Sequence, residues 1–206
     1  MTDRLLPELA DLDLRTVDPG LHDLARKRFA ARDALGFVAL TDNDRALRLV
    51  LDNLFALRAA GMYEQALLEA LTGVRTNHHR WSLRILMLPL EHADRDRLRA
   101  AGAPLPGPGP FTLYRGVHDP GPARKIRGLH WTSSPSTAAR FATRFAEWGD
   151  AHDPAVFVVR VAASAVRAYV TDRGEDDYLV VLPPDVRPRR LPTLPEPIRP
   201  GSAVTP

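Results

Sequence analysis

Three adjacent acids stand directly before an apolar run in the stretch DRGEDDYLVVLP, residues 172–183. Glu175, Asp176 and Asp177 repel one another, and a simple turn needs only one Asp and the Gly. The run that follows them is typical of a buried strand. Alone, such a stretch is most often a solvated turn. Three carboxylates at the edge of a core nevertheless invite a cation, or a reacting centre that becomes positive.

A cationic residue ends a second short apolar run, TLYRGV. The guanidinium of Arg115 can bind a phosphate, and Gly116 beside it lets the backbone come close to a ligand. The commoner role of a single arginine at the end of a strand is an ion pair with a surface acid. Basic residues in ARKIR (Arg124, Lys125 and Arg127) can add positive charge, although a solvated loop is the commoner explanation for them.

Hydroxyl side chains end a third apolar run in GLHWTSSPSTAARFA. Ser134 or Ser136 is suited to cap the helix that follows. Thr132 and Ser133 lie too early to cap it, and hydroxyls in that position can orient a carboxylate or a ribose.

Histidines give weaker signals. His78 and His79 are adjacent in TNHHRW, so their side chains point apart, and no acid-rich partner lies nearby in sequence. We therefore expect no metal site. His118 and His130 stand close to the motifs above, and the sequence assigns them no role.

Helical periodicity dominates the first half of the chain. Apolar residues recur at helical spacing in residues 21–36, 46–57, 62–73 and 80–102. Gly36 is the expected end of the first helix, the second stripe is expected to continue to Gly61, and Pro89 is expected to kink or divide the last helix. We predict a helical N-terminal region over residues 1–105.

The spacing of apolar residues is no longer helical after APLPGPGP, residues 103–110. This stretch is typical of a rigid linker. Short β-branched and aromatic runs then predict strands at 111–116, 128–132, 155–161, 166–170 and 178–182. A helix with Phe141 on its apolar face is expected between the second and third strands. The predicted fold class is α+β, with the mixed region over 106–185 and a proline-rich extended tail over 186–206.

The amino-acid composition narrows the classes of molecule that the chain is expected to bind. The 206 residues carry 28 basic and 25 acidic side chains, a net charge of +3, which does not indicate nucleic-acid binding. No apolar stretch is long enough to span a membrane, and the N-terminus lacks the apolar run of a signal peptide. The absence of cysteine excludes disulfides. A cytoplasmic location is expected, and secretion by a route without a signal peptide stays open.

Read in chain order, the three motifs resemble the arginine-serine-glutamate class of mono-ADP-ribosyltransferases. The matching stretches are LYRG, WTSS with AARFA, and EDDYLVV, within roughly residues 111–183. The chain is also similar to uncharacterised phage and bacterial members that carry Trp-Thr in the hydroxyl strand. The resemblance implies a helical region followed by a split β-sandwich that binds NAD as substrate. ADP-ribose would pass to a protein or other macromolecular acceptor with release of nicotinamide, without a metal.

The resemblance also implies roles for single residues. Arg115 would bind the NAD diphosphate or the ribose on the nicotinamide side, and the Gly116 backbone would meet the nicotinamide carboxamide. Thr132 and Ser133 match the second and third hydroxyl positions. Phe141 is the expected aromatic beside nicotinamide, with core packing as the commoner role for such a ring.

In the acid turn, Glu175 matches the first acid, which would position or deprotonate the acceptor, and Asp177 matches the second, catalytic acid. Departure of nicotinamide leaves positive charge on the ribose, and a fixed carboxylate stabilises that charge more than it stabilises the ground state. Another register makes Glu175 the catalytic acid.

Two departures from the family pattern keep alternatives open. Trp131 occupies the first hydroxyl position, which removes a group that would brace the acid. Asp177 is one methylene shorter than Glu, and a displacement of about 1 Å can cost about a hundredfold in rate. The chain is therefore expected to be an ADP-ribosyltransferase, a weakened or inactive member that acts as a binding module, or a toxin-like NAD glycohydrolase.

Overall fold

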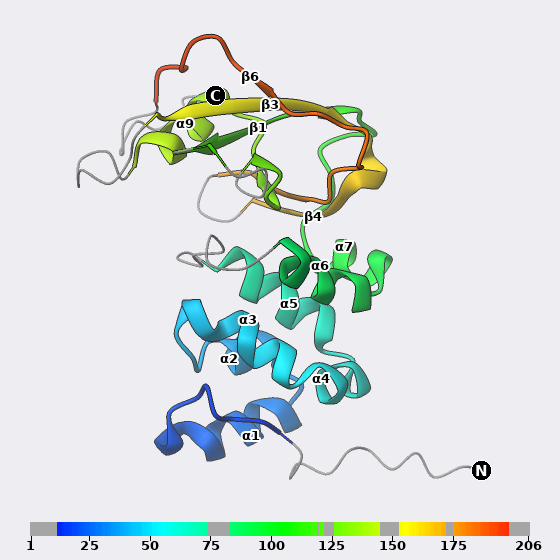
Figure 1. Cartoon of the computed structure of the whole chain (residues 1–206). Helices are drawn as coiled ribbons and strands as arrows, with labels where there is room; N and C mark the ends of the chain where they lie inside the picture. The colour runs from blue at the N-terminus through cyan, green and yellow to red at the C-terminus, as the bar shows by residue number, and fades with distance from the viewer. Residues whose placement is uncertain are drawn as a thin grey trace. The chain divides into compact units, whose positions relative to one another are not determined.

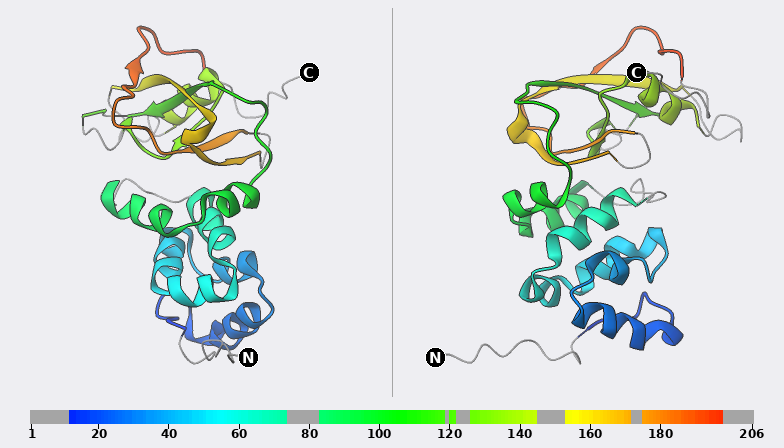
Figure 2. Two further views of the ribbon diagram at one scale, coloured as in Figure 1. Left: turned by 90° about the vertical axis from the view of Figure 1, so that its right-hand side faces the viewer. Right: turned by 180° about the vertical axis from the view of Figure 1, so that it is seen from behind.

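The computed structural model of the chain describes residues 12–73, 83–118, 120–121, 126–144, 153–171 and 175–197. The chain divides into two compact units, Met1–Ala101 and Gly102–Pro206 (Figure 1, Figure 2). In the described ranges the first unit is helical and the second carries two small antiparallel sheets. The fold is therefore α+β, with helices first and sheets second, as the sequence predicts.

The N-terminal unit is built around one central helix. Its helices are α1 (His22–Ala30), α2 (Ala34–Val38), α3 (Asn43–Asp52), α4 (Leu54–Ala60), α5 (Tyr63–Thr72), α6 (Leu83–His92) and α7 (Arg95–Ala101). Helices α2, α3, α4 and α7 all contact α5. Neighbours on several sides explain why Tyr63, Ala66 and Leu67 are completely buried. No helix in the described ranges has the length and apolar character that a membrane span requires.

Three details of these helices differ from the sequence prediction. Gly36 lies inside α2 rather than at a helix end, because the Asp33 carboxylate caps α2 and accepts from the Gly36 N–H at 2.8 Å. The stripe expected to continue to Gly61 is interrupted at Asn53, between α3 and α4. Pro89 does not divide its segment, and α6 runs through it.

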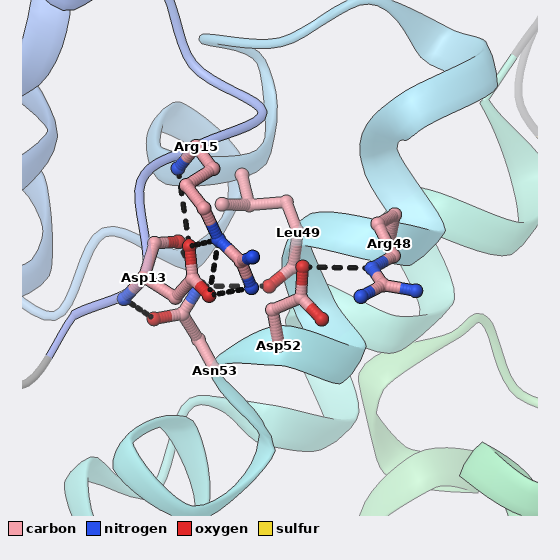
Figure 3. Close-up of polar contacts among 6 residues, drawn as sticks. All are labelled: Asp13, Arg15, Arg48, Leu49, Asp52 and Asn53. Atoms are coloured by element: carbon pink, nitrogen blue, oxygen red, sulfur yellow. Dashed lines mark hydrogen bonds and ion pairs between the residues drawn. The ribbon is translucent and has the colours of Figure 1, made fainter.

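Asn53 interrupts the helix because its side chain holds the segment around Asp13 (Figure 3). The amide nitrogen donates to the backbone oxygens of Asp13 at 2.8 Å and Leu49 at 2.9 Å. The amide oxygen accepts from the Asp13 N–H at 2.8 Å. Asn53 is buried, so these bonds satisfy polar groups that water does not reach.

In its described residues, the C-terminal unit contains the five predicted strands and one more. The first sheet has the order β1 (Phe111–Val117), β3 (Ala155–Val161), β6 (Arg189–Arg190), and the second has the order β2 (His130–Trp131), β5 (Asp177–Val180), β4 (Val166–Val170). All of these pairs are antiparallel. The additional strand, β6, lies within the stretch expected to be an extended tail from residue 186 onward. Val186 and Leu191 also contact buried clusters.

The two sheets share one apolar core. Its members include Leu113 and Val159 of the first sheet and Trp131 and Tyr178 of the second. Helix α9 (Pro135–Thr143) covers the other face of β1 and β3 (Figure 1). Because side chains alternate along a strand, Arg115 points to the same side of β1 as the core residue Leu113, towards the second sheet.

A single bridge links the sheets beside Arg115. The Tyr114 N–H donates to the Thr132 carbonyl at 2.7 Å, and the Thr132 N–H donates to the Tyr114 carbonyl at 2.9 Å. The bridge brings the end of β2, with its hydroxyl residues, next to the arginine of β1.

Candidate functional site

The side chain of Arg115 is held against β2 by a hydrogen bond to the backbone of that strand. Its Nη1 donates to the carbonyl of His130 at 2.7 Å. A Cβ atom at Gly128 would lie 2.3 Å from Nη2, so the guanidinium fits there only because residue 128 is glycine. Burial lowers the pKa of Arg115 to about 10, and the charge of Asp177 opposes this shift. Arg115 is thus a fixed cation at neutral pH, and it lies within the field of one of the three acids.

Asp177 is the first residue of β5, and its carboxylate contacts a histidine of β2. His130 Nδ1 lies 2.8 Å from Asp177 Oδ2. In the β2–β5 register His130 is opposite Leu179, so its contact with Asp177 is diagonal. The two side chains are 28% and 31% exposed, so a solute can reach both. The residue that binds Arg115 through its carbonyl therefore binds Asp177 through its ring.

The middle acid, Asp176, is bound by the hydroxyl residues. Its Oδ1 accepts from Thr132 Oγ1 at 2.5 Å, and its Oδ2 accepts from the Ser133 N–H at 3.0 Å and from the Ser133 hydroxyl. Thr132 Oγ1 accepts from the Ser134 N–H at 3.1 Å, and Ser134 Oγ caps α9 by accepting from the Thr137 N–H at 3.1 Å. Thr132 and Ser133 thus bind a carboxylate, which is one of the two partners expected for them.

The first acid, Glu175, points to helix α9, where its Oε1 accepts from Arg140 Nη2. The next residue of the helix, Phe141, is 38% exposed, so core packing is not its role. The guanidinium carbons of Arg140 and Arg144 each lie 5.3 Å from the centroid of its ring. Burial lowers the pKa of Arg144, the charge of Arg140 lowers it further, and Glu175 opposes both effects. This end of α9 is a partly exposed aromatic ring between two cations.

Each of the three adjacent acids thus has its own partner from a different part of the unit. Asp177 joins His130, Asp176 joins the hydroxyls after β2, and Glu175 joins a cation of α9. The separation explains how the turn tolerates three like charges, because each is offset locally.

Gly116 is a glycine for a reason that the sequence did not indicate. A Cβ atom there would lie 1.8 Å from the Ala138 carbonyl oxygen and 2.7 Å from the Ala142 nitrogen. Close packing of α9 on β1 therefore requires the glycine. Contact of its backbone with a ligand stays a prediction.

The side chain that contacts Asp177 belongs to a residue to which the sequence assigned no role. Trp131, expected at the first hydroxyl position, is a core residue whose Nε1 donates to the Gly128 carbonyl at 2.8 Å. The contact to Asp177 comes from His130, one residue earlier. From the sequence, Asp176 had no role of its own among the three acids, and Arg140 was not a candidate. Strand alternation was the available signal, because neighbouring residues 176 and 177 must point to opposite sides and meet different partners.

Other charged residues near the motifs serve the fold or lie outside the described ranges. Arg127 donates at 2.7 to 3.0 Å to backbone carbonyls that follow β5, those of Leu182, Pro183 and Val186. Arg124, Lys125, His78 and His79 are not among the described residues. Within the ranges that are described, no group of three His, Cys, Asp or Glu side chains could hold a metal ion.

No family model, no curated protein and no solved structure matches this chain. At the junction of the two sheets, hydrogen bonds join Arg115, His130 and Asp177.

Proposed function

We propose that the chain is an NAD-dependent mono-ADP-ribosyltransferase and that its second unit is the split β-sandwich of the arginine-serine-glutamate class. The observation that carries the proposal is the connected set formed by Arg115, His130 and Asp177. It combines a fixed cation with a fixed, partly exposed anion. Cleavage of NAD needs a cation for the diphosphate and an anion for the sugar.

Arg115 is suited to bind the diphosphate or the adjacent ribose, because its guanidinium is held in one orientation by the His130 carbonyl and remains charged. As the bond between nicotinamide and ribose breaks, the anomeric carbon becomes electron-poor. The Asp177 carboxylate stabilises that charge. Both groups are oriented before the substrate arrives, so little reorganisation is needed during the reaction.

The contacts also support a different role for each of the three acids. Asp176 accepts three hydrogen bonds and tethers the turn to β2. Asp177 is the acid coupled to Arg115, which favours it over Glu175 as the catalytic residue. Glu175, paired with Arg140, is left to position or deprotonate the acceptor.

A catalytically weakened or inactive NAD-binding member is the second candidate. Two observations favour it. Asp177 has a shorter arm than glutamate, and the hydroxyls of Thr132 and Ser133 already donate to Asp176 rather than being directed to a ribose.

The test is incubation of the purified chain with NAD labelled in its adenylate part, together with a cell lysate. We expect nicotinamide release and labelled acceptor, both reduced at least about a hundredfold by Arg115→Ala and by Asp177→Asn, the loss typical when a transition-state contact is removed. Arg187→Ala and Asp185→Asn, at exposed positions, are the matched controls.

The products separate the alternatives. Nicotinamide without labelled acceptor identifies an NAD glycohydrolase. NAD binding by calorimetry without nicotinamide release identifies a binding module. If NAD is neither bound nor cleaved, the proposal is wrong.

A further inference from the structure

We infer that His130 is a positioning residue, which holds Asp177 and Arg115 in register and whose length compensates for the methylene that Asp177 lacks. The inference rests on the proposed function and adds to it a residue that neither the motifs nor the resemblance assigned. It also predicts that residues 130 and 177 are matched in size, so that neither can be exchanged alone.

The first step is that one residue touches both charged groups. The His130 carbonyl accepts from Arg115 Nη1 at 2.7 Å, and its Nδ1 lies 2.8 Å from Asp177 Oδ2. A carboxylate can only accept, so Nδ1 carries the proton and donates. Displacement of the backbone at residue 130 would therefore move the cation and the anion together.

The second step is that this backbone is fixed on both sides. The preceding Gly128 carbonyl accepts from the Trp131 indole at 2.8 Å, and Trp131 is 2% exposed. Immediately after Trp131, Thr132 exchanges two backbone hydrogen bonds with Tyr114 of β1. The imidazole of His130 therefore extends from a backbone held by the core and by the bridge between the sheets.

The combined length of the His130 and Asp177 side chains matches the distance between their backbones. His130 and Asp177 are diagonal neighbours on adjacent strands, and Cβ atoms in that relation are roughly 7 Å apart, slightly less than the Cα separation. An imidazole and a short carboxylate span that distance. A serine at position 130 would leave Asp177 without a partner, whereas a glutamate at position 177 would overreach against the imidazole.

The experiment is a double-substitution cycle of the full chain, using His130→Ser, Asp177→Glu and the pair together. We expect His130→Ser to lower kcat for nicotinamide release about a hundredfold, the cost of a misplacement near 1 Å, with the KM for NAD nearly unchanged. Asp177→Glu alone should also lower kcat. The double variant should recover most of the loss, because Ser and Glu are matched in length again. His92→Ser, an exposed histidine of α6, is the control.

Independent losses in the two single variants, with no recovery in the double variant, would overturn the inference. So would a gain of activity in Asp177→Glu alone, since an enzyme weakened only by a short acid improves when the acid is lengthened. Thermal unfolding of each variant reports whether a loss reflects unfolding. His130→Asn is the conservative variant, because its amide nitrogen lies about as far from Cβ as Nδ1 does and keeps a donor in place. It should retain most of kcat, and a loss as large as that of His130→Ser would overturn the inference.

A second readout does not require turnover. The imidazole nitrogens of His130, followed by NMR, should shift on Asp177→Asn, and those of His92 should not. An unchanged His130 signal overturns the inference whatever the activity. A shifted signal in a protein that neither binds nor cleaves NAD overturns the proposed function, and the pair then has no catalytic role.

Discussion

At the residue scale, Asp176 joins two segments of the proposed site through its hydrogen bonds. Its two oxygens accept from the Thr132 hydroxyl, the Ser133 N–H and the Ser133 hydroxyl. These bonds join the turn before β5 to the end of β2. Since Asp177 follows directly, the tether at Asp176 limits where the proposed catalytic carboxylate can lie.

We predict that Asp176→Ala lowers the free energy of unfolding of the C-terminal unit by about 1.5–3 kcal/mol, the range for hydrogen bonds to a charged group. Denaturant unfolding followed by tryptophan fluorescence measures the change, because Trp131 is buried in that unit. Asp185→Ala, an exposed acid, should change stability by less than about 0.5 kcal/mol. Equal effects of the two substitutions would show that the tether contributes nothing.

At the scale of elements, the contact between α9 and β1 controls the geometry on both sides of the site. Helix α9 carries Arg140, the partner of Glu175, and β1 carries Arg115. The two elements approach so closely at Gly116 that a Cβ atom would overlap the Ala138 carbonyl. Any change in the spacing between α9 and β1 therefore moves Arg140 relative to Arg115.

Gly116→Ala is therefore expected to destabilise the unit by about 1–3 kcal/mol, the usual cost of overpacking. It should also weaken NAD binding, if the proposed function holds, because α9 must shift away from β1. Thermal unfolding and calorimetry measure the two effects. Gly107→Ala is the matched control, since a Cβ atom there meets nothing within 4 Å. A fully stable Gly116→Ala variant would contradict the close packing described above.

On the scale of the whole molecule, both units contain ionisable groups whose pKa the folded state shifts. In the C-terminal unit, burial raises the pKa of Tyr178 to about 12 and lowers that of Arg115 to about 10. In the N-terminal unit, hydrogen bonds from Arg15, foremost that of its side chain, lower the pKa of the Asp13 carboxyl to about 2 (Figure 3). Protonation of Asp13 at low pH should therefore remove part of the stability of that unit.

Because the folded state lowers the pKa of Asp13, its contribution to stability is present above the ordinary value of 3.8 and is lost as the pH falls towards about 2. Asp13→Asn should remove this acid-dependent loss. The effect will be below about 1 kcal/mol, because Arg15 is largely exposed and the pair is screened. Unfolding measured between pH 5 and pH 2 tests this, with Asp44→Asn as the control. An unchanged pH dependence would contradict the assignment.

The order of helices and strands follows from local patterns, and so does the helix cap at Ser134. Helical spacing and β-branched runs depend on near neighbours in the chain, so the sequence alone was sufficient to predict the α+β class and the positions of strands β1 to β5. It was not sufficient for β6, whose arginines and prolines lack a strand pattern. That strand forms because β3 offers a free edge to residues 189–190.

The sequence also identified Arg115, the hydroxyl residues and the acids as candidate site residues, but it did not determine which acid contacts which partner. Those contacts join residues 35 to 47 positions apart, from Arg140 with Glu175 to His130 with Asp177. They depend on strand register and on the side to which each residue points, and a shift of one residue exchanges the two sides. Register is set by packing of the shared core, so only the tertiary structure could give His130 and Asp176 their places.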